Sequence, residues 1–353
     1  MNEKLLLTLP KKNIRALDPY SAKEIKCRIK LDGNESPYAI SGLNLKKCLS
    51  LPLNRYPDPE AKALRKVLAK DAKISPEMIV CGNGSDELIN CLITVYGGPV
   101  LCPVPTFAMY SIISKSLGVE FRGIPLNKNF DLDEDRMLNA VKQHKPKLIF
   151  MSSPNNPTGN CFSSATILKL INASKGIVVV DEAYQPFASE RGFMPMLEDF
   201  PNLVILRTLS KIGLAGLRTG FAAANPLIIN EINKVRLPYN INSLSQSAAV
   251  EGLKNKKIIR TNIKKIVDER LRVYDGLNSL NGITAFPSEA NFILFKTEST
   301  DNVYNELLKK GILVKNLSSS IKGCLRVTVG SEKENAAFLK ALGSIIKNQL
   351  YKK

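Results

Sequence analysis

Residues 177–184 read IVVVDEAY, so that four β-branched apolar residues lead directly into the carboxylate of Asp181. A run of this kind is typical of a strand buried on both faces of a parallel sheet. Similar apolar runs lie on either side, separated by segments with apolar residues three and four apart. We therefore predict an α/β domain with a mostly parallel, mixed sheet wrapped by helices. Its strands are expected at residues 78–81, 100–102, 147–151, 177–180, 203–207 and 220–223.

The pattern changes after residue 226. One long amphipathic helix is expected over about 256–280, followed by strand, strand, helix, strand, strand and a final helix near 332–347, which is the pattern of a smaller α+β domain. The first forty residues hold two proline-containing turns and little periodicity, so we interpret them as an arm that packs elsewhere. The predicted division is a large α/β domain over 41–250, and a second unit made of 1–40 and 251–353.

Composition excludes several classes of function. The seven cysteines of this 353-residue chain are scattered and never form a CxxC pair, which argues against a disulfide framework or a zinc site. The single histidine, His144, excludes a mechanism based on a histidine pair or triad. The 50 lysines and arginines are spread along the chain, so we expect a solvated surface and no nucleic-acid partner. Without a long apolar run or a signal-peptide pattern, a cytoplasmic protein with no membrane contact is expected.

The stretch most informative about chemistry is residues 208–220, TLSKIGLAGLRTG, directly after a predicted strand. Lys211 is flanked by hydroxyl and glycine residues, which let the backbone approach a bound anion, and Arg218 follows seven residues later. A partly buried lysine near other positive charge is easier to deprotonate, as Schiff-base chemistry requires. Taken alone, the stretch could equally be a surface loop with an incidental lysine.

Asp181 and Tyr184 favour the chemical interpretation. A carboxylate at the end of a buried parallel strand needs a partner, and a protonated pyridine nitrogen is one. This ion pair would keep a pyridine ring protonated and make it an electron sink. Tyr184 is placed to donate a hydrogen bond to the phenolic oxygen of such a cofactor. If Lys211 were absent, a helix cap would be the default interpretation of Asp181.

Two further turns follow predicted strands. Residues 153–159, SPNNPTG, form a constrained turn where α/β sheets bind ligands, and Asn156 is a candidate second donor to the same oxygen. Residues 82–87, GNGSDE, join a strand to a helix. Backbone N–H groups at a helix start bind phosphate, which makes Gly84, Ser85 and Asp86 a candidate phosphate cradle. Each turn by itself could be purely structural.

Taken together, these motifs closely resemble fold-type I pyridoxal-phosphate enzymes, and among them histidinol-phosphate aminotransferases. Single motifs of this kind are weak, but eleven of them in the right order over nearly the whole chain are specific. They lie at residues 18–20, 31–37, 54–58, 82–87, 105–110, 153–159, 181–184, 208–220, 236–242, 288–292 and 325–330.

The resemblance implies pyridoxal 5′-phosphate as the cofactor, held as a Schiff base on Lys211. Freed by an incoming amino acid, the lysine amine is expected to carry a proton from the substrate's Cα to the cofactor's C4′. Tyr110 is implied to stack on the pyridine ring, and Ser210 and Arg218 to hold the phosphate with the glycine-rich turn. Tyr56 is implied to reach that phosphate from the neighbouring subunit of a homodimer.

For the substrates, the resemblance implies that Arg326 binds an acidic group such as the carboxylate of glutamate, with Tyr20 and Asn34 nearby. The implied reaction interconverts L-histidinol phosphate and 2-oxoglutarate with imidazole acetol phosphate and L-glutamate, in histidine biosynthesis. The chain departs from the family at two positions. Arg218 follows the lysine by seven residues where the family has eight, and Lys315 stands where the family usually has an arginine, keeping the charge without the bidentate fork.

Three alternatives remain open at this point. An aromatic amino-acid aminotransferase could use the same residues if the site at Lys315 takes no phosphate. A phosphothreonine decarboxylase shares the scaffold. A transcription regulator with this fold would carry a fused DNA-binding module, and too few residues precede Tyr20 to build a helix-turn-helix.

Overall fold

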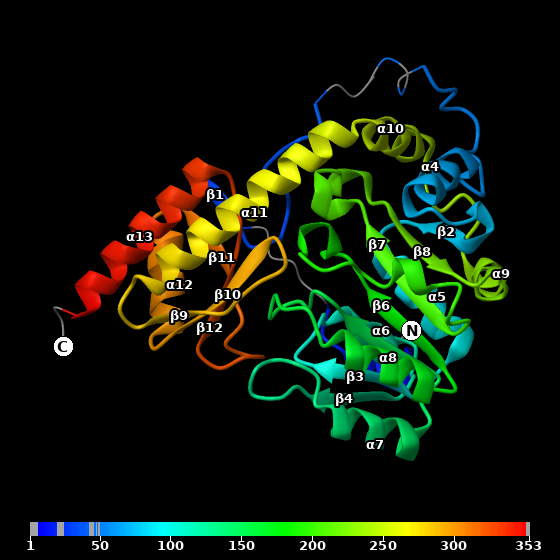
Figure 1. Cartoon of the computed structure of the whole chain (residues 1–353), viewed down its shortest axis with the longest axis horizontal. Coiled ribbons are helices and arrows are strands. Elements are labelled where there is room, and N and C mark those ends of the chain that lie inside the picture. The colour runs from blue at the N-terminus through cyan, green and yellow to red at the C-terminus, as the bar shows by residue number, and fades with distance from the viewer. Residues whose placement is uncertain (1–5, 20–24, 42–45, 47, 49, 351–353) are drawn as a thin grey trace.

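The computed structural model describes residues 6–19, 25–41, 46, 48 and 50–350, which form two sheets (Figure 1). The larger sheet has seven strands in the order β2-β8-β7-β6-β5-β3-β4. Strand β8 is antiparallel to both neighbours and the other pairs are parallel, so the predicted mostly parallel, mixed sheet is confirmed. The bounds are β2 (Ile79–Gly82), β3 (Val100–Val104), β4 (Phe121–Pro125), β5 (Leu148–Ser152), β6 (Ile177–Asp181), β7 (Leu203–Thr208) and β8 (Gly220–Ala224).

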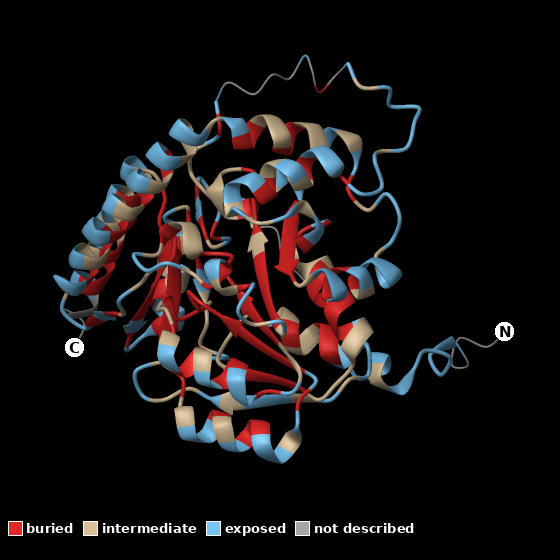
Figure 2. Cartoon of the chain, turned by 45° about the vertical axis from the view of Figure 1, so that its right-hand side comes forward, coloured by how far each residue is buried: buried red, intermediate tan, exposed pale blue. Residues whose placement is uncertain are grey.

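Helices cover both faces of this sheet because its strands are apolar on both sides. In β6, Val178 and Val180 pack into one buried cluster and Val179 into another, as expected when successive side chains of a strand point to opposite faces. Figure 2 shows the buried strands enclosed by helices with exposed outer surfaces. The covering helices are α4 (Lys62–Ala72), α5 (Ser85–Tyr96), α6 (Met109–Ser116), α7 (Glu134–His144), α8 (Ser164–Ala173), α9 (Pro226–Val235) and α10 (Ser243–Lys254).

The second sheet has five strands in the order β1-β11-β12-β10-β9. The predicted order of elements after the long helix is confirmed. Strand β1 was not predicted; it comes from the N-terminal segment and pairs in parallel with β11, with Ile29 opposite Ile312. The bounds are β1 (Ile29–Leu31), β9 (Ile283–Ala285), β10 (Phe292–Thr297), β11 (Ile312–Asn316) and β12 (Cys324–Thr328), with helices α11 (Lys256–Asn278), α12 (Thr300–Lys309) and α13 (Glu332–Leu350).

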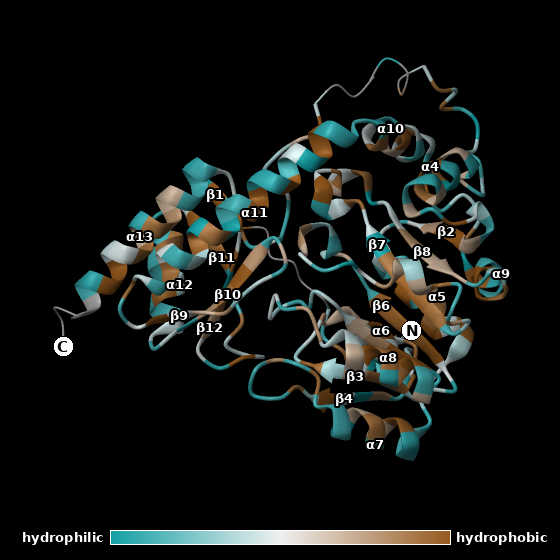
Figure 3. Ribbon diagram, in the orientation of Figure 1, coloured by the Kyte–Doolittle hydropathy of each residue, from teal (hydrophilic) through white to brown (hydrophobic). Residues whose placement is uncertain are grey.

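Helix α11, yellow in Figure 1, runs from α10 beside the larger sheet to the smaller sheet. The domain boundaries near residues 40 and 250 stay a prediction. Hydropathy alternates along the helices, while the central strands of the larger sheet are mostly apolar (Figure 3). Among the helices of the described residues, none has both the length and the apolar character needed to cross a membrane.

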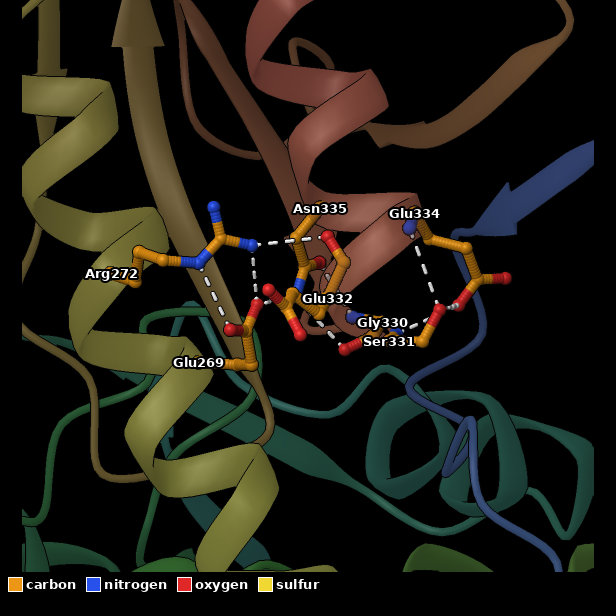
Figure 4. Close-up of polar contacts among 7 residues, drawn as sticks. All are labelled: Glu269, Arg272, Gly330, Ser331, Glu332, Glu334 and Asn335. Atoms are coloured by element: carbon orange, nitrogen blue, oxygen red, sulfur yellow. Dashed lines mark hydrogen bonds and ion pairs between the residues drawn. The ribbon is translucent and has the colours of Figure 1, made fainter.

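A polar cluster joins α11 to the turn between β12 and α13 (Figure 4). The amide of Asn335 donates to Glu269 of α11 at 2.8 Å and exchanges hydrogen bonds with the backbone of Gly330. Ser331 and Glu334 bond to each other in the manner of a capping box at the start of α13. The turn that follows β12 is therefore fixed to α11.

Candidate active site

Lys211 lies where the two sheets meet. It follows β7 in a short 3-10 turn, Ser210–Ile212, and its side chain is partly buried. Its Nζ is 3.4 Å from the carbonyl oxygen of Gly33, just after β1 of the smaller sheet, and donates to it. The same Nζ lies 5.7 Å from the ring centre of Tyr184, just after β6 of the larger sheet. Three segments that are distant in sequence therefore converge on one amine.

Asp181 ends β6 and is only 3% exposed. Its Oδ1 accepts a hydrogen bond from the backbone N–H of Ala183, and its Oδ2 accepts one from the hydroxyl of Tyr110. Burial raises the pKa of Asp181 to about 6, although both hydrogen bonds oppose that rise. Within the part of the chain that the structure describes, no cation pairs with this carboxylate. A buried carboxylate without a cation fits a protonated pyridine nitrogen.

Tyr110, on α6, is 0% exposed, and its ring stacks on Phe150 with centroids 4.9 Å apart. The stacking on a pyridine ring that the resemblance implied for Tyr110 does not fit this burial, because no face of the ring is free. Phe107 packs edge-on against Tyr110 at 5.6 Å and keeps accessible surface. The sequence prediction missed Phe107, although the motif at residues 105–110 contains both aromatic rings.

Tyr184 and Asn34 contact each other directly. The hydroxyl of Tyr184 accepts a 2.9 Å hydrogen bond from Nδ2 of Asn34. Asn34 is buried, has a positive φ of 52°, and makes two further hydrogen bonds with Thr328 of β12. Asn34 therefore lies between Tyr184 and Thr328, and its place near the substrate stays a prediction. Tyr20, the other residue implied there, lies outside the described residues.

Arg218 lies beside the glycine-rich turn that was predicted as a phosphate cradle. Gly84, with a φ of 83°, directly precedes α5, and a Cβ there would lie 2.9 Å from Nη2 of Arg218. The same Nη2 is 3.5 Å from Oδ2 of Asp86, so the seven-residue spacing still brings Arg218 to the helix start. Ser85 is the first residue of α5, and buried Ser210 bonds to the hydroxyl of Thr208. Free N–H groups of a helix start beside a guanidinium suit a phosphate.

Arg326 of β12 connects the segment after β1 to the turn that contains Asn156. The guanidinium is buried, donates to Oδ1 of Asn156 and to the carbonyl of Asp32, and lies 5.1 Å from the ring of Phe292. Lys315 of β11 is directly opposite Arg326 in the antiparallel register. Side chains at directly opposite positions leave the same face, so these two positive charges share one face of the sheet. Lys315 is exposed, whereas Arg326 is held in place.

Tyr56 lies on the surface of the single chain. The residue is 81% exposed, and its ring stacks on Tyr239 with centroids 4.6 Å apart. Leu53 and Leu237 are exposed large apolar residues on the same two segments of the chain.

The chain matches the family model "Aminotransferase class I and II" over residues 45–342. It is 42% identical to a histidinol-phosphate aminotransferase of Nitrosococcus oceani over 348 residues, which cover 95% of this chain and 96% of that protein. The structure of the histidinol-phosphate aminotransferase from Clostridium acetobutylicum superposes with a TM-score of 0.85 at 26% identity, covering 91% of this chain and 99% of that one.

A third comparison concerns the fold. The histidinol-phosphate aminotransferase of Sinorhizobium meliloti, solved in complex with pyridoxal 5′-phosphate, has a TM-score of 0.88 at 23% identity, covering 97% of this chain and 98% of that one. The predicted fold type I is confirmed. The family model spans most of the chain and the N. oceani relative nearly all of it, so this protein belongs to the class I and II aminotransferases.

Proposed function

We propose that this aminotransferase uses pyridoxal 5′-phosphate to move the amino group of L-histidinol phosphate to 2-oxoglutarate, giving imidazole acetol phosphate and L-glutamate, in histidine biosynthesis. The observation that carries the cofactor is the buried Asp181 carboxylate, which has hydrogen-bond donors but no cation among the described residues. The named relatives support the substrate pair.

Each part of the cofactor has a residue suited to it. Lys211 provides the amine for covalent attachment, and Asp181 provides the counter-charge for the pyridine nitrogen. Tyr184 and Asn156 are the donors for the phenolic oxygen, and Phe107 offers an aromatic face. The phosphate group would be bound by Gly84, Ser85, Asp86, Ser210 and Arg218, with Tyr56 of a second copy. When bound, pyridoxal phosphate stores the amino group and withdraws electrons from the substrate carbon.

The remaining chemistry belongs to this chain. We assign to the Lys211 amine the transfer of a proton from the substrate's Cα to the cofactor's C4′. The contact of Nζ with the carbonyl of Gly33 supports this role, because it holds the amine beside the segment that carries Asn34 and beside the ring of Tyr184. A fixed amine lowers the entropic cost of proton transfer.

Substrate recognition rests on the two cations of the smaller sheet. Arg326 has the planar fork that suits a carboxylate, and its other hydrogen bonds fix its orientation. Lys315 presents a compact charge on the same face, which suits a phosphate or a second carboxylate without bidentate geometry. The pair therefore fits substrates with two separated acidic or phosphorylated ends, as in 2-oxoglutarate and glutamate.

The proposal includes a homodimer. Tyr56 is 81% exposed, its ring stacks on Tyr239, and exposed Leu53 and Leu237 lie on the same two segments. Such a surface is suited to burial against a second copy. Light scattering of the purified protein tests this, with a mass of two chains expected and a mass of one chain contradicting it.

The reaction is tested by supplying the cofactor and 2-oxoglutarate with one amino donor at a time: histidinol phosphate, phenylalanine or phosphothreonine. Glutamate formation and carbon dioxide release are measured in parallel. We expect glutamate to form fastest with histidinol phosphate and no carbon dioxide above background. Faster turnover of phenylalanine would replace the proposal with an aromatic aminotransferase, and carbon dioxide from phosphothreonine would replace it with a decarboxylase.

A further inference from the structure

Thr328 of β12 makes two hydrogen bonds to a single residue, Asn34. Its Oγ1 accepts from the backbone N–H of Asn34 at 2.9 Å, and its own hydroxyl hydrogen is donated to Oδ1 of Asn34 at 3.1 Å. Both residues are buried, so water does not compete for these groups. The amide of Asn291 also donates to the carbonyl of Asn34 at 3.0 Å. Asn34, which has a left-handed backbone conformation, is thus held at its N–H, its carbonyl and its side chain.

The bond from Thr328 decides which way the amide of Asn34 faces. A carboxamide has an acceptor end and a donor end of nearly the same shape, so hydrogen-bond partners alone select its orientation. The hydroxyl of Thr328 accepts from the backbone N–H of Asn34 and donates its one hydrogen to Oδ1 of the same residue. The donor end, Nδ2, then faces the hydroxyl of Tyr184 at 2.9 Å.

The orientation of Asn34 in turn decides what Tyr184 can do. A phenol has one hydrogen to donate, and the hydroxyl of Tyr184 accepts from Asn34, so that hydrogen is left for another acceptor. Accepting one hydrogen bond also strengthens a hydroxyl as a donor. The ring itself is buried and held edge-on by Phe292 at 5.1 Å. With the opposite orientation of the Asn34 amide, Tyr184 would donate to Oδ1 and have nothing to offer a ligand.

We propose that Thr328 is a positioning residue of this enzyme, which fixes the Asn34 amide so that Tyr184 acts as the hydrogen-bond donor to the cofactor's phenolic oxygen. The inference rests on the cofactor site of the proposed function. Arg326 lies two residues before Thr328 on β12, so both side chains leave the same face of the strand. One strand therefore holds both the carboxylate-binding arginine and the group that orients Tyr184.

The test compares Thr328→Val, which keeps the shape and removes the hydroxyl, with Thr328→Ser, which keeps the hydroxyl. The holoenzyme is titrated with pH, and the midpoint of the change in its visible cofactor absorbance is recorded. A donor to the phenolic oxygen stabilises its negative charge, so loss of the donor leaves that oxygen holding the Schiff-base proton more tightly. We expect Thr328→Val to raise the midpoint by about one pH unit. Thr328→Ser is expected to keep the wild-type midpoint.

A kinetic readout separates positioning from binding. In Thr328→Val we expect kcat to fall roughly tenfold while KM for 2-oxoglutarate stays within about twofold, because the lost interaction acts on the cofactor and not on the acidic group. A soluble Thr328→Val holoenzyme with an unchanged midpoint would overturn the inference, as would a Thr328→Ser midpoint shifted as far as that of the valine variant.

A second variant keeps the test open if Thr328→Val does not fold. In Asn34→Asp the new aspartate tolerates the left-handed backbone. Its carboxylate has no hydrogen to donate and accepts a hydrogen bond from the hydroxyl of Tyr184, which then has no hydrogen left for the cofactor. The midpoint is again expected to rise, and an unchanged midpoint would overturn the inference. If wild-type protein supplied with pyridoxal phosphate has no visible absorbance band, the proposed function itself is wrong. If the wild type has the band and the variants keep its pH midpoint, only this inference is wrong.

Discussion

The hydroxyl of Tyr110 donates a 2.7 Å hydrogen bond to Oδ2 of Asp181, and both side chains are buried. Burial raises the pKa of Tyr110 well above its ordinary value, so the phenol stays protonated and remains a donor. Its hydrogen bond lowers the pKa of Asp181 against the larger effect of burial. Tyr110 therefore keeps the carboxylate ionised in a place where water cannot.

Replacing Tyr110 by phenylalanine is expected to raise the pKa of Asp181 above about 6, because it removes the hydrogen bond that opposes burial. We expect the pKa of Asp181 in the cofactor-free variant to lie roughly one unit above that in the cofactor-free wild type. Infrared titration of the carboxyl band measures this difference. An unchanged pKa would show that the hydrogen bond does not control Asp181.

The pH dependence of stability offers a second test, on the cofactor-free protein. The pKa of Asp181 is about 6 in the folded protein, against an ordinary value of 3.8 that we take for the unfolded chain. Between pH 3.8 and pH 6 the folded state therefore binds more protons than the unfolded state. Stability from this group therefore falls as the pH rises through that window, and the penalty is complete above about pH 6. Its size is on the order of 2–3 kcal/mol.

Asp181→Asn removes this penalty together with the charge. We expect the unfolding free energy of the cofactor-free variant, relative to wild type, to rise between pH 4 and pH 6 and then level off. An amide has one oxygen where the carboxylate has two, so the absolute difference also contains the loss of one of the hydrogen bonds donated by Ala183 and Tyr110. The pH dependence is therefore the informative quantity. Denaturant titrations at several pH values measure it, and a difference that does not vary with pH would refute the assignment.

Arg270 on α11 is 6% exposed and bridges two loops of the site. Its Nη1 donates to the carbonyls of Phe187 and Ala290, each at 3.1 Å, and its Nη2 lies 3.7 Å from Glu289. Lysine is shorter and has a single nitrogen, so it cannot keep both carbonyl bonds together with the contact to Glu289. We expect Arg270→Lys to lower the unfolding free energy by on the order of 2–3 kcal/mol, because buried acceptors are left unpaired.

The matched control for Arg270 lies two residues further along the same helix. The side chain of Arg272 is 42% exposed and pairs with Glu269, so Arg272→Lys is expected to cost less than about 1 kcal/mol. Thermal or denaturant unfolding compares the two variants. Equal losses of unfolding free energy in the two variants would mean that the buried hydrogen bonds of Arg270 do not stabilise the protein more than the exposed ion pair of Arg272.

Lys315 is expected to contribute to substrate binding and not to the chemical step. Lys315→Ala should raise KM for histidinol phosphate about tenfold with kcat nearly unchanged, since one charge-assisted contact is lost equally from ground and transition states. Lys315→Arg keeps the positive charge and should leave KM for histidinol phosphate close to that of the wild type. Lys309→Ala removes an exposed lysine of the neighbouring α12 and is the control. A fall in kcat without a change in KM would contradict this role.

The sequence predicted the strands of the larger sheet where apolar runs were long, and it failed where tertiary pairing alone makes the strand. Strand β4 is an edge strand whose side chains are mostly exposed, and its sequence FRGIP contains no apolar run. Strand β1 is three residues long and exists because it pairs with β11, which is far away in the chain. Neither pairing leaves a periodic signal in the local sequence.

The same limit applies to the candidate site. Lys211, Asp181 and Tyr184 could be proposed from the sequence because their residue types and their positions after strands suit the chemistry. The partners of Tyr110 and Asn34 could not be foreseen, because those contacts depend on how α6 and β12 pack against distant segments. The resemblance implied a stacking ring at Tyr110, whereas in the structure its buried hydroxyl donates a hydrogen bond to Asp181.

The most direct test of the central claim is reduction of the holoenzyme with borohydride followed by tryptic peptide mapping. Borohydride fixes a Schiff base as a stable amine, and trypsin does not cut at a modified lysine. We predict a cofactor-modified peptide spanning residues 208–218, uncut at Lys211, which disappears in Lys211→Ala. Modification at another lysine, or none in protein saturated with pyridoxal phosphate, would contradict the account.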